Sequence, residues 1–385
     1  MKHWPTKPLE EVAKIFGGGT PSRDNPAFWG GEIHWITPTD LPMPDSGISV
    51  VSKSKDRITQ AGLDDSSATV VPKETVLFSS RATIGKVAVA DMPLATNQGF
   101  VNFIPHSEMS SRFLAYILWY HREDIARLSG STTFKEVSRG TLRKYRIPVP
   151  PLLEQERIVR LLDEAEEMRK LRAKADRRAA DLIPALFNEM FGDPLGNSEN
   201  WPTSELRKLG RVVTGATPPS AKDGMFAGDI PFITPGDLNS NTQEPKRFLT
   251  EAGAAEVRIV RAGTTLVCCI GATIGKTDRT WNRSAFNQQI NAVEWGAQVD
   301  DDYGVECMRK CSSAVIRQGS STALPILKKS LFERIEIPVP PLALQKQFAA
   351  CVSEARTMQA DQTSSKDRLD DLFNSLLHRA FNGEL

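Results

Sequence analysis

The chain has 385 residues, with 48 basic and 47 acidic side chains and a formal net charge of +1. This length predicts two or three domains, and a composition with 40% hydrophobic and 25% charged residues excludes a disordered chain. The near-neutral charge provides no overall field that would attract nucleic acid, so any nucleic-acid-binding function needs other support. No apolar run is long enough to predict a membrane-spanning helix. The first residues also lack the apolar core of a signal peptide, and we therefore expect a cytoplasmic protein.

The pattern of the first 150 residues predicts a globular part with mixed α/β structure. Short β-branched runs, among them Val76–Phe78 and Val87–Val89, are separated by turn residues, which is typical of short strands. Helices are expected at Phe113–Trp119 and, in the second half of the chain, at Val305–Ile316.

A long helix is predicted after the Pro150-Pro151 pair, because proline is tolerated in the first helical turn. The stretch Leu152–Phe191 contains no glycine, and Gly192 follows it as a stop signal. We expect Pro184 to kink this helix or to end it early, since proline removes a backbone donor and clashes with the preceding turn.

The second half of the sequence repeats the first. Ile36–Leu41 recurs as Ile233–Leu238 at an offset of 197, and Thr83–Lys86 recurs as Thr273–Lys276 at an offset of 190. The Ile-Pro-Val-Pro-Pro-Leu block that precedes the first long helix also recurs at 190, and it predicts a second helix of about 40 residues, or ~60 Å. The change of offset means that the second copy is about seven residues shorter between the first two blocks. Ordered matches of this kind indicate an internal duplication.

Apolar or small residues recur at heptad spacing along both long helices. In the first helix these are Ile158, Leu161, Ala165, Met168, Ala175, Ala179, Leu182 and Leu186. In the second they are Phe348, Cys351, Ala355, Met358, Ser365, Leu369, Leu372 and Leu376. Flanks with charges of both signs favour a solvated coiled coil. A two-fold relation between the copies makes the pairing antiparallel, with the globular parts expected at opposite ends; the alternative is that each helix packs on its own globular part.

The predicted fold is therefore α+β, with two pseudo-symmetric halves. Each half is a mixed α/β globular part followed by a long helix, and the two helices pair as an antiparallel coiled coil. The expected boundaries are 1–150 for the first globular part, 151–192 for the central helix, 193–340 for the second globular part and 341–385 for the C-terminal helix.

No motif in the sequence indicates catalysis or metal binding. Gly271–Thr277 resembles a phosphate-binding loop but has three residues between its glycines where that motif has four, and no helical pattern follows. Asn25–Phe28 resembles the Asn-Pro-Pro-Phe/Tyr motif of amino-group methyltransferases, but the second copy lacks it and a surface turn is favoured. The five histidines do not cluster, and the five cysteines lack paired spacing, which predicts reduced thiols.

The ordered motifs resemble the specificity subunits of type I restriction–modification systems, and the resemblance spans the whole chain. It rests on Gly18–Ser22, on the repeated Ile-Thr-Pro-x-Asp-Leu and Ala-Thr-Ile-Gly-Lys blocks, and on the repeated Asn-Gln pair. It rests also on Ile-Pro-x-Pro-Pro-Leu with Gln155 or Gln345 soon after, and on the C-terminal run from Leu372 to Leu385. The first copy departs from the pattern at Ser80-Arg81, where the second has Ile-Gly.

This resemblance implies a non-catalytic, sequence-specific DNA-binding subunit without a cofactor of its own. Each globular part would be a target recognition domain that reads one half of a split, asymmetric DNA site, and the helices would set the spacer. The implied partners are double-stranded DNA, two methyltransferase (modification) subunits and restriction/translocase subunits, with no membrane. S-adenosylmethionine, ATP and Mg²⁺ are expected on the partner subunits only.

Comparison of the two copies separates two classes of candidate DNA-binding residues. Residues that both copies share are candidates for phosphate contacts and framework: Thr20, Lys86, Asn97, Gln98, Ser131, Thr217, Lys276, Asn287, Gln288 and Ser320. Residues that differ between the copies are candidates for base contacts: Ser22, Arg23, Thr132, Lys135, Lys222 and Ser321. An arginine such as Arg23 can bond guanine as a bidentate fork. The alternative for Lys86 and Lys276 is a turn brace through backbone carbonyls, and a loop brace is favoured for the shared amides.

Two other functions stay open at this point. One is a DNA adenine methyltransferase-like enzyme that uses Asn25–Phe28. The other is a coiled-coil scaffold that does not touch DNA.

Overall fold

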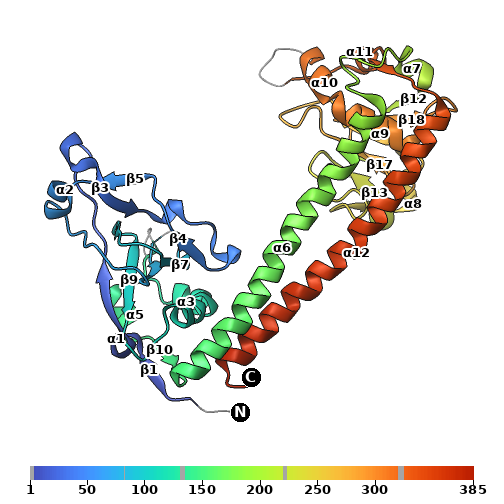
Figure 1. Ribbon diagram of the computed structural model, residues 1–385. Helices are drawn as coiled ribbons and strands as arrows, with labels where there is room; N and C mark the ends of the chain where they lie inside the picture. Colours follow the sequence, from blue (N-terminus) through green and yellow to red (C-terminus); the bar gives the residue numbers. More distant parts are fainter. Residues whose placement is uncertain (1–3, 82, 131–134, 220–222, 320–324) are drawn as a thin grey trace. The chain divides into compact units, whose positions relative to one another are not determined.

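The computed structural model describes residues 4–81, 83–130, 135–219, 223–319 and 325–385. The chain forms two compact units. The first unit comprises Met1–Arg172 and Lys366–Leu385, and the second comprises Ala173–Ser365. Each unit therefore contains one globular part and a portion of both long helices (Figure 1). Within the described residues, no helix combines the length and the apolar character needed to cross a membrane.

The globular part of the first unit is built on three sheets. The largest has the strand order β2-β9-β6-β7-β4, with β2 (Ala13–Gly17), β9 (Phe100–Pro105), β6 (Val76–Ser79), β7 (Val87–Ala90) and β4 (Ser49–Val51). The second has the order β5-β3-β8, with β5 (Asp56–Ile58), β3 (Trp29–Ile36) and β8 (Ala95–Thr96). The third pairs β1 (Thr6–Pro8) with β10 (Arg146–Pro148).

Helices of the first unit cover the large sheet and join the strands. They are α1 (Leu9–Val12), α2 (Gln60–Asp64), α3 (Ser111–Tyr120), α4 (Arg122–Arg127) and α5 (Arg139–Lys144). Single 3₁₀ turns lie at Pro26–Phe28, Pro38–Asp40 and Pro44–Ser46. Seven consecutive residues of α3, Phe113–Trp119, are buried, because this helix lies between the sheet and the long helices. The strands and the helix that the sequence predicts here are confirmed.

The second unit repeats this plan. One sheet has the order β12-β18-β15-β16, with β12 (Gly210–Thr214), β18 (Ile290–Trp295), β15 (Thr265–Cys268) and β16 (Thr277–Arg279). Another has the order β14-β13-β17, with β14 (Phe248–Leu249), β13 (Phe226–Ile233) and β17 (Ala285–Phe286). A third pairs β11 (Thr203–Glu205) with β19 (Glu336–Pro338). The helices are α7 (Leu206–Leu209), α8 (Glu251–Ala255), α9 (Asp301–Lys310), α10 (Ser312–Gln318) and α11 (Lys329–Phe332).

The second unit differs from the sequence prediction in one helix and from the first unit in one strand. The single helix expected at Val305–Ile316 is two helices, α9 and α10, because the chain leaves helical geometry at Cys311, which ends one and precedes the other. Strand β4, which pairs in parallel with β7 in the first unit, has no counterpart within the described residues of the second. This missing strand lies in the stretch where the sequence offset falls from 197 to 190.

Both long helices have the predicted length. Helix α6 (Leu152–Phe191) and helix α12 (Leu342–Phe381) each contain 40 residues. Helix α6 continues through Pro184, so the expectation that proline ends it early is wrong. The residues around Pro184 are held from outside the helix, since Ile183 and Phe187 are buried in the core of the second unit.

The helices pair in antiparallel fashion within each unit. In the first unit the beginning of α6 meets the end of α12: Ile158 and Leu162 share a core with Phe373 and Leu377, and Arg169 Nε donates to Asp370 Oδ1 at 2.6 Å. In the second unit the end of α6 meets the beginning of α12, with ring centroids of Phe187 and Phe348 5.7 Å apart. The predicted antiparallel pairing is confirmed.

The buried face of the helices is not the predicted heptad seam throughout. Met168, Leu182 and Leu372 are 47%, 46% and 48% exposed, whereas Leu162, Ile183 and Phe373 next to the predicted positions are buried. Both alternatives of the sequence analysis therefore hold at once. Near its ends each helix packs on the other helix and on a globular part, and two partners turn the buried face away from a strict seam.

Candidate DNA interface

A loop with a glycine at a matched position and a turn with an Asn-Gln pair meet at the same place in both units. Gly18 passes so close to the turn that a Cβ atom there would lie 2.0 Å from the Asn97 carbonyl oxygen. The matched Gly215 would place a Cβ atom 2.2 Å from the Asn287 carbonyl oxygen. Only glycine permits this approach, since real Cβ contacts are never this short. In each loop a threonine lies two residues after this glycine. The close approach places that threonine next to the glutamine of the turn.

The result is a hydroxyl–amide pair in each unit. Thr217 Oγ1 donates to Gln288 Oε1 at 2.8 Å, and Thr20 Oγ1 donates to Gln98 Oε1 in the same way. Both pairs are exposed to solvent. The hydroxyl donates to the amide oxygen, and each exposed glutamine keeps two amide N–H groups that can donate to a nucleic-acid acceptor. All four residues are candidates from the sequence, and in the structure they contact each other pairwise.

The asparagines next to these glutamines brace the turn. Asn97 Oδ1 accepts the backbone N–H of Gly99 at 2.9 Å. Asn287 Oδ1 accepts the backbone N–H of Gln289 at 3.1 Å, and its amide nitrogen donates to Gln289 Oε1 at 3.0 Å. These bonds support the favoured alternative for the asparagines, in which they shape the loop.

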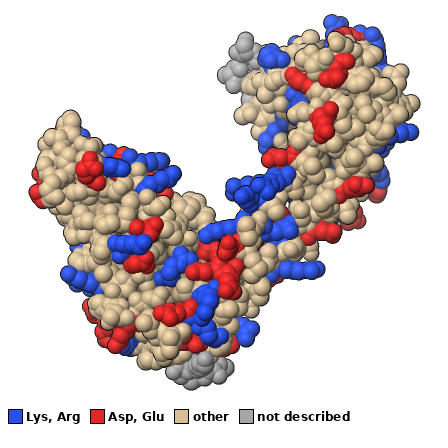
Figure 2. All heavy atoms as spheres, viewed as in Figure 1, with Lys and Arg blue, Asp and Glu red and all other residues tan. Residues whose placement is uncertain are grey.

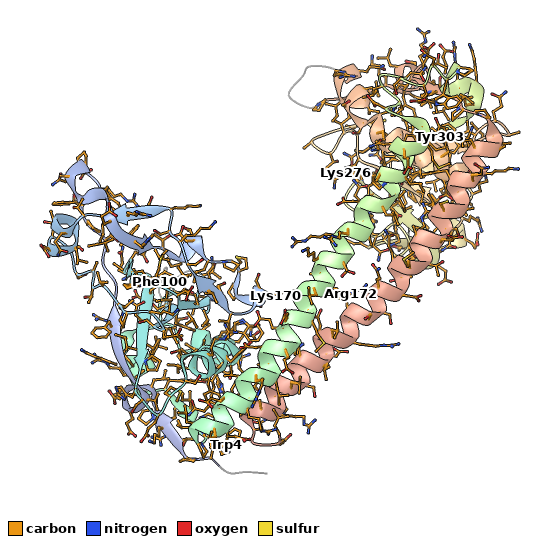
Figure 3. The ribbon with its side chains drawn as sticks, in the orientation of Figure 1. Trp4, Phe100, Lys170, Arg172, Lys276 and Tyr303 are labelled. Atoms are coloured by element: carbon orange, nitrogen blue, oxygen red, sulfur yellow. The ribbon has the colours of Figure 1, made fainter. Side chains whose placement is uncertain are left out.

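The two matched lysines differ. Lys86 is 8% exposed, and its ammonium donates to the carbonyl oxygens of Pro38 at 2.7 Å and Leu41 at 2.8 Å. This geometry favours the turn-brace alternative for Lys86. Lys276 is only partly buried, and within the described residues no hydrogen bond or ion pair is recorded for its ammonium (Figure 3). In the second unit a carboxylate holds the corresponding loop, since Asp278 Oδ2 accepts the backbone N–H of Asn239 at 2.9 Å.

The remaining candidates fall into two groups. Ser22, Arg23 and Lys135 are exposed. Ser131, Thr132, Lys222, Ser320 and Ser321 lie outside the described residues. Arg23 is the most strongly positioned of the exposed group: its guanidinium carbon lies 4.1 Å from the ring centroid of Trp29, and its Nη2 lies 3.5 Å from Asp56 Oδ2.

The first unit also contains a basic groove that no sequence motif predicts. It has a volume of about 590 Å³ and lies along β2 and α5, where Lys14, Arg139 and Arg143 contribute to its lining. No ion pair is recorded for these three side chains within the described part of the chain. Such a surface can contact the DNA backbone, because free cations release counterions when they neutralise phosphates. Only the fold brings Lys14 to the two arginines, since it lies more than 100 positions before Arg139 and Arg143 in the sequence.

The equivalent surface of the second unit is neutralised. Arg211, at the position of Lys14, pairs with Glu294 on the neighbouring strand. Lys329, at the position of Arg139, lies 3.1 Å from Glu333, which stands where the first unit has Arg143. The two units therefore share a framework but differ in their electrostatics. Over the face shown in Figure 2, basic and acidic side chains are intermixed, in keeping with the net charge of +1.

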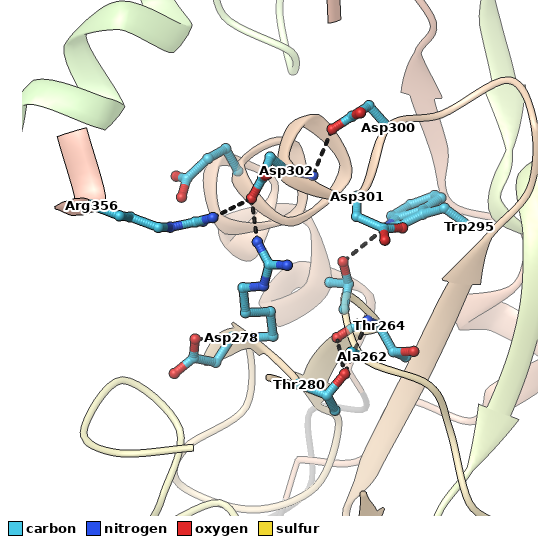
Figure 4. A network of polar contacts seen from close by, with 12 residues as sticks. Ala262, Thr264, Asp278, Thr280, Trp295, Asp300, Asp301, Asp302 and Arg356 are labelled. Carbon is cyan, nitrogen blue, oxygen red and sulfur yellow. Dashed lines mark hydrogen bonds and ion pairs between the residues drawn. The ribbon is translucent and has the colours of Figure 1, made fainter. Parts of the chain in front are cut away.

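Ion pairs join each globular part to the long helices. The acidic residue belongs to the globular part in the second unit and to the long helix in the first. In the second unit Asp302 of α9 accepts from Arg356 of α12 and from Arg279 of β16 (Figure 4). In the first unit the matched α3 residue is Arg112, and it donates to Asp163 of α6. Burial lowers the pKa of Arg279 in spite of the Asp302 charge. These contacts position the globular parts on the helices.

The motifs that resemble catalytic sites are turns. Asn25 Oδ1 accepts the backbone N–H of Ala27 at 3.1 Å and so caps the 3₁₀ turn at Pro26–Phe28. Strand β16, and not a helix, follows the loop at Gly271. Among the residues that the structure describes, no cluster of three or more His, Cys, Asp or Glu side chains suits a metal ion.

Comparisons with known sequences agree with these features. The sequence matches the family model of the type I restriction modification DNA specificity domain over residues 1–175 and 198–358. The MjaIX specificity subunit of a type I restriction enzyme from Methanocaldococcus jannaschii is 27% identical over 409 residues, which cover 100% of this chain and 94% of the relative. The EcoR124I/EcoR124II specificity subunit from Escherichia coli is 32% identical over 169 residues, which cover 42% of this chain and 41% of the relative.

Solved structures show the same fold. A chain from a structure concerned with complex assembly and conformational transition of the type I R-M system aligns with a TM-score of 0.66 at 17% identity, covering 99% of this chain and 98% of that chain. The S subunit of a type I restriction-modification system from M. genitalium aligns with a TM-score of 0.60 at 16% identity, covering 98% and 96%. With two matched family regions and a duplicated α+β architecture, the chain belongs to the type I restriction–modification DNA specificity family, whose function is the recognition of a DNA target.

Proposed function

We propose that this chain reads a bipartite, asymmetric DNA site, with one half-site contacted by each globular part. The observation that carries the proposal is the duplicated pair of exposed side chains, Thr20–Gln98 and Thr217–Gln288, on a shared framework. Matched frameworks with different neighbouring side chains suit two surfaces that approach DNA alike but read different bases. The chain itself carries out no catalysis and holds no cofactor in this proposal.

The proposal includes partners that supply the chemistry. Two methyltransferase subunits would bring S-adenosylmethionine, and restriction/translocase subunits would bring ATP and Mg²⁺. The near-neutral charge of the chain supports this division, because partner subunits can supply much of the phosphate contact. The assembly would act in the cytoplasm.

An exchange of globular parts tests the proposal. Residues 1–150 are joined at the Pro150-Pro151 boundary to the second half of a relative with a known site, and the chimera is expressed with methyltransferase subunits. Mapping of methylated adenines should yield a hybrid site with one half from each parent. A chimera that still modifies the complete site of either parent would overturn the assignment of one half-site to each part.

A deletion in both helices tests the proposed role of the coiled coil. Removing seven residues from each helix keeps the heptad register and shortens each by ~10 Å. Both half-sites should stay unchanged while the spacer between them becomes shorter. An unchanged spacer in a folded variant would show that the helices do not set it.

Labelled S-adenosylmethionine separates the enzyme alternative from this proposal. We expect the isolated chain not to bind it, because Asn25 is used as a turn cap. The scaffold alternative predicts that the chain fails to bind DNA even together with methyltransferase subunits.

A further inference from the structure

Both units hold an arginine over a matched pair of aromatic rings. In the first unit the pair is Trp29 and Trp35 of β3, with ring centroids 5.1 Å apart and an interplanar angle of 87°. In the second unit the pair is Phe226 and Phe232 of β13, with centroids 5.9 Å apart and an angle of 81°. Each pair occupies the first and seventh positions of its strand, at the 197-residue offset of the repeat. The rings are therefore part of the duplicated framework.

The guanidinium groups occupy nearly the same position over the two ring pairs. The Cζ atom of Arg23 lies 4.1 Å and 5.4 Å from the centroids of Trp29 and Trp35. The Cζ atom of Arg247 lies 3.9 Å and 5.5 Å from the centroids of Phe226 and Phe232. The geometry of the site is thus repeated, although the two arginines are not equivalent in the sequence repeat.

The two arginines reach the rings from different elements. Arg23 belongs to the loop after β2, and Asp56 at the start of β5 lies 3.5 Å from it. Asp56 is the residue that pairs with Trp35 across the β3–β5 ladder. In the second unit the corresponding position, two residues before Leu249, is Arg247, whose carbonyl oxygen accepts the Phe232 N–H at 3.0 Å. An arginine directly before β14 replaces the arginine–aspartate arrangement of the first unit.

These guanidinium groups remain available to a ligand. The Arg23 side chain is 61% exposed, and Arg247 is exposed as well. No carboxylate partner of Arg247 is recorded within the described residues. Stacking on an aromatic face orients the guanidinium plane and leaves its N–H fork free at the edge. A positioned fork of this kind matches the O6 and N7 acceptors of guanine in the major groove.

The arginine sites adjoin the hydroxyl–amide pairs. Trp35 Nε1 donates to the Gly19 carbonyl oxygen at 3.0 Å, and Trp29 Nε1 donates to that of Ser22 at 3.0 Å, so the rings hold the loop that carries Thr20. In the second unit β13, which carries both rings, pairs in parallel with β17, and Asn287-Gln288 directly follows β17. In each unit the strand that carries the rings therefore contacts an element that carries one member of the hydroxyl–amide pair.

We infer that Arg247 is a base-reading, specificity-determining residue of the second globular part, and that it is the functional counterpart of Arg23 in the first. The inference rests on the proposed bipartite DNA recognition. Arg247 was not among the candidates from sequence, because the sequence repeat aligns it with an aspartate. Its preferred ligand is a guanine edge in the half-site that the second part contacts.

The test compares three variants in the full chain, co-expressed with methyltransferase subunits. Wild-type methylation mapping first defines the two half-sites, and duplexes with single base changes then measure discrimination. Arg247→Lys keeps the charge but removes the fork, so it should lower discrimination roughly 10- to 100-fold at one position of one half-site. Arg23→Lys should do the same in the other half-site. Arg283→Lys, an exposed arginine paired with Glu251, is the matched control and should change neither.

The outcomes separate this inference from the proposed function. A wild-type complex without a bipartite site would refute the proposed function. A wild-type complex that discriminates, together with an Arg247→Lys variant whose base preferences are unchanged, would overturn the inference alone. A uniform loss of affinity for all sequences would assign Arg247 to a phosphate and also overturn it. Arg247→Ala with the melting temperature measured adds a check, since a purely structural arginine would lower stability and leave the base preferences intact.

Discussion

The Thr217 hydroxyl donates to the Gln288 amide oxygen at 2.8 Å, and Thr20 contacts Gln98 in the same way 190 to 197 residues earlier. Each threonine follows a glycine loop, and each glutamine follows a short parallel strand. The contact is therefore made twice by the fold and not by neighbours in sequence. It gives both globular parts an exposed amide whose donors have a defined direction.

We predict that each glutamine acts on one half-site only. Gln288→Ala should weaken recognition of one half-site about tenfold, and Gln98→Ala should weaken the other, because one hydrogen bond to a base or phosphate is lost. Binding to duplexes with one half-site scrambled measures the two effects separately.

A double-mutant cycle checks the role of the threonines. Thr217→Ala should have a smaller effect than Gln288→Ala, and the double variant should be no worse than Gln288→Ala alone, since the hydroxyl only orients the amide. Additive losses would mean that the threonine contacts DNA independently.

The matched lysines should respond differently to substitution. Lys86→Ala removes two buried hydrogen bonds from an ammonium, so we expect a loss of about 1–3 kcal/mol of stability without a change in the salt dependence of DNA binding. Lys276→Ala should leave stability unchanged and make the slope of log K against log salt shallower by about 0.9 if it contacts a phosphate. Chemical denaturation and salt titrations measure both. Equal behaviour of the two variants would contradict the difference in their contacts.

The charged contact of Asp302 with Arg279 should contribute to the stability of the second unit. Asp302→Ala should destabilise the second unit by about 3 kcal/mol, because Asp302 and Arg279 are less than a fifth exposed and Arg279 would be left as a buried charge without this partner. Among the residues that the structure describes, the Nε atom of Arg279 already has no hydrogen-bond partner.

A second substitution tests this explanation. Arg279→Val introduces the residue found at the matched position of the first unit, Val89, and should restore part of the stability lost in Asp302→Ala. Glu251→Ala, which breaks an exposed pair, is the control and should change stability by less than about 0.5 kcal/mol. If the double variant is less stable than Asp302→Ala, the unpaired charge is not the cause.

The basic groove should contribute to DNA affinity in the first unit only. Arg143→Ala should reduce the salt slope by up to about 0.9 and weaken cognate and unrelated DNA alike, because a phosphate contact carries no base information. Lys329→Ala in the second unit is the matched control, since that side chain is paired with Glu333. A loss confined to cognate DNA would assign Arg143 to a base instead.

The duplication, the two long helices and the family resemblance followed from the sequence alone. They depend on the order and spacing of motifs and on helix signals such as Pro150-Pro151, which are local properties of the chain. The antiparallel pairing followed as well, since a repeat related by two-fold symmetry reverses the direction of its second helix. The shared Thr20, Gln98, Thr217 and Gln288 were candidates for the same reason, but that each threonine pairs with a glutamine was not predicted.

Tertiary structure alone decided what each candidate side chain contacts. Lys86 and Lys276 are identical in the repeat, yet one is buried against two carbonyls and the other is not, because Asp278 holds the loop in the second unit. Arg23 and Arg247 are not aligned in the repeat, yet they stack on matched aromatic pairs in the two units. The buried face of the helices likewise departs from the heptad pattern where a globular part adds a second partner. In each case the contact depends on how the chain folds in three dimensions, whereas periodicity and offset reflect only what is local or duplicated.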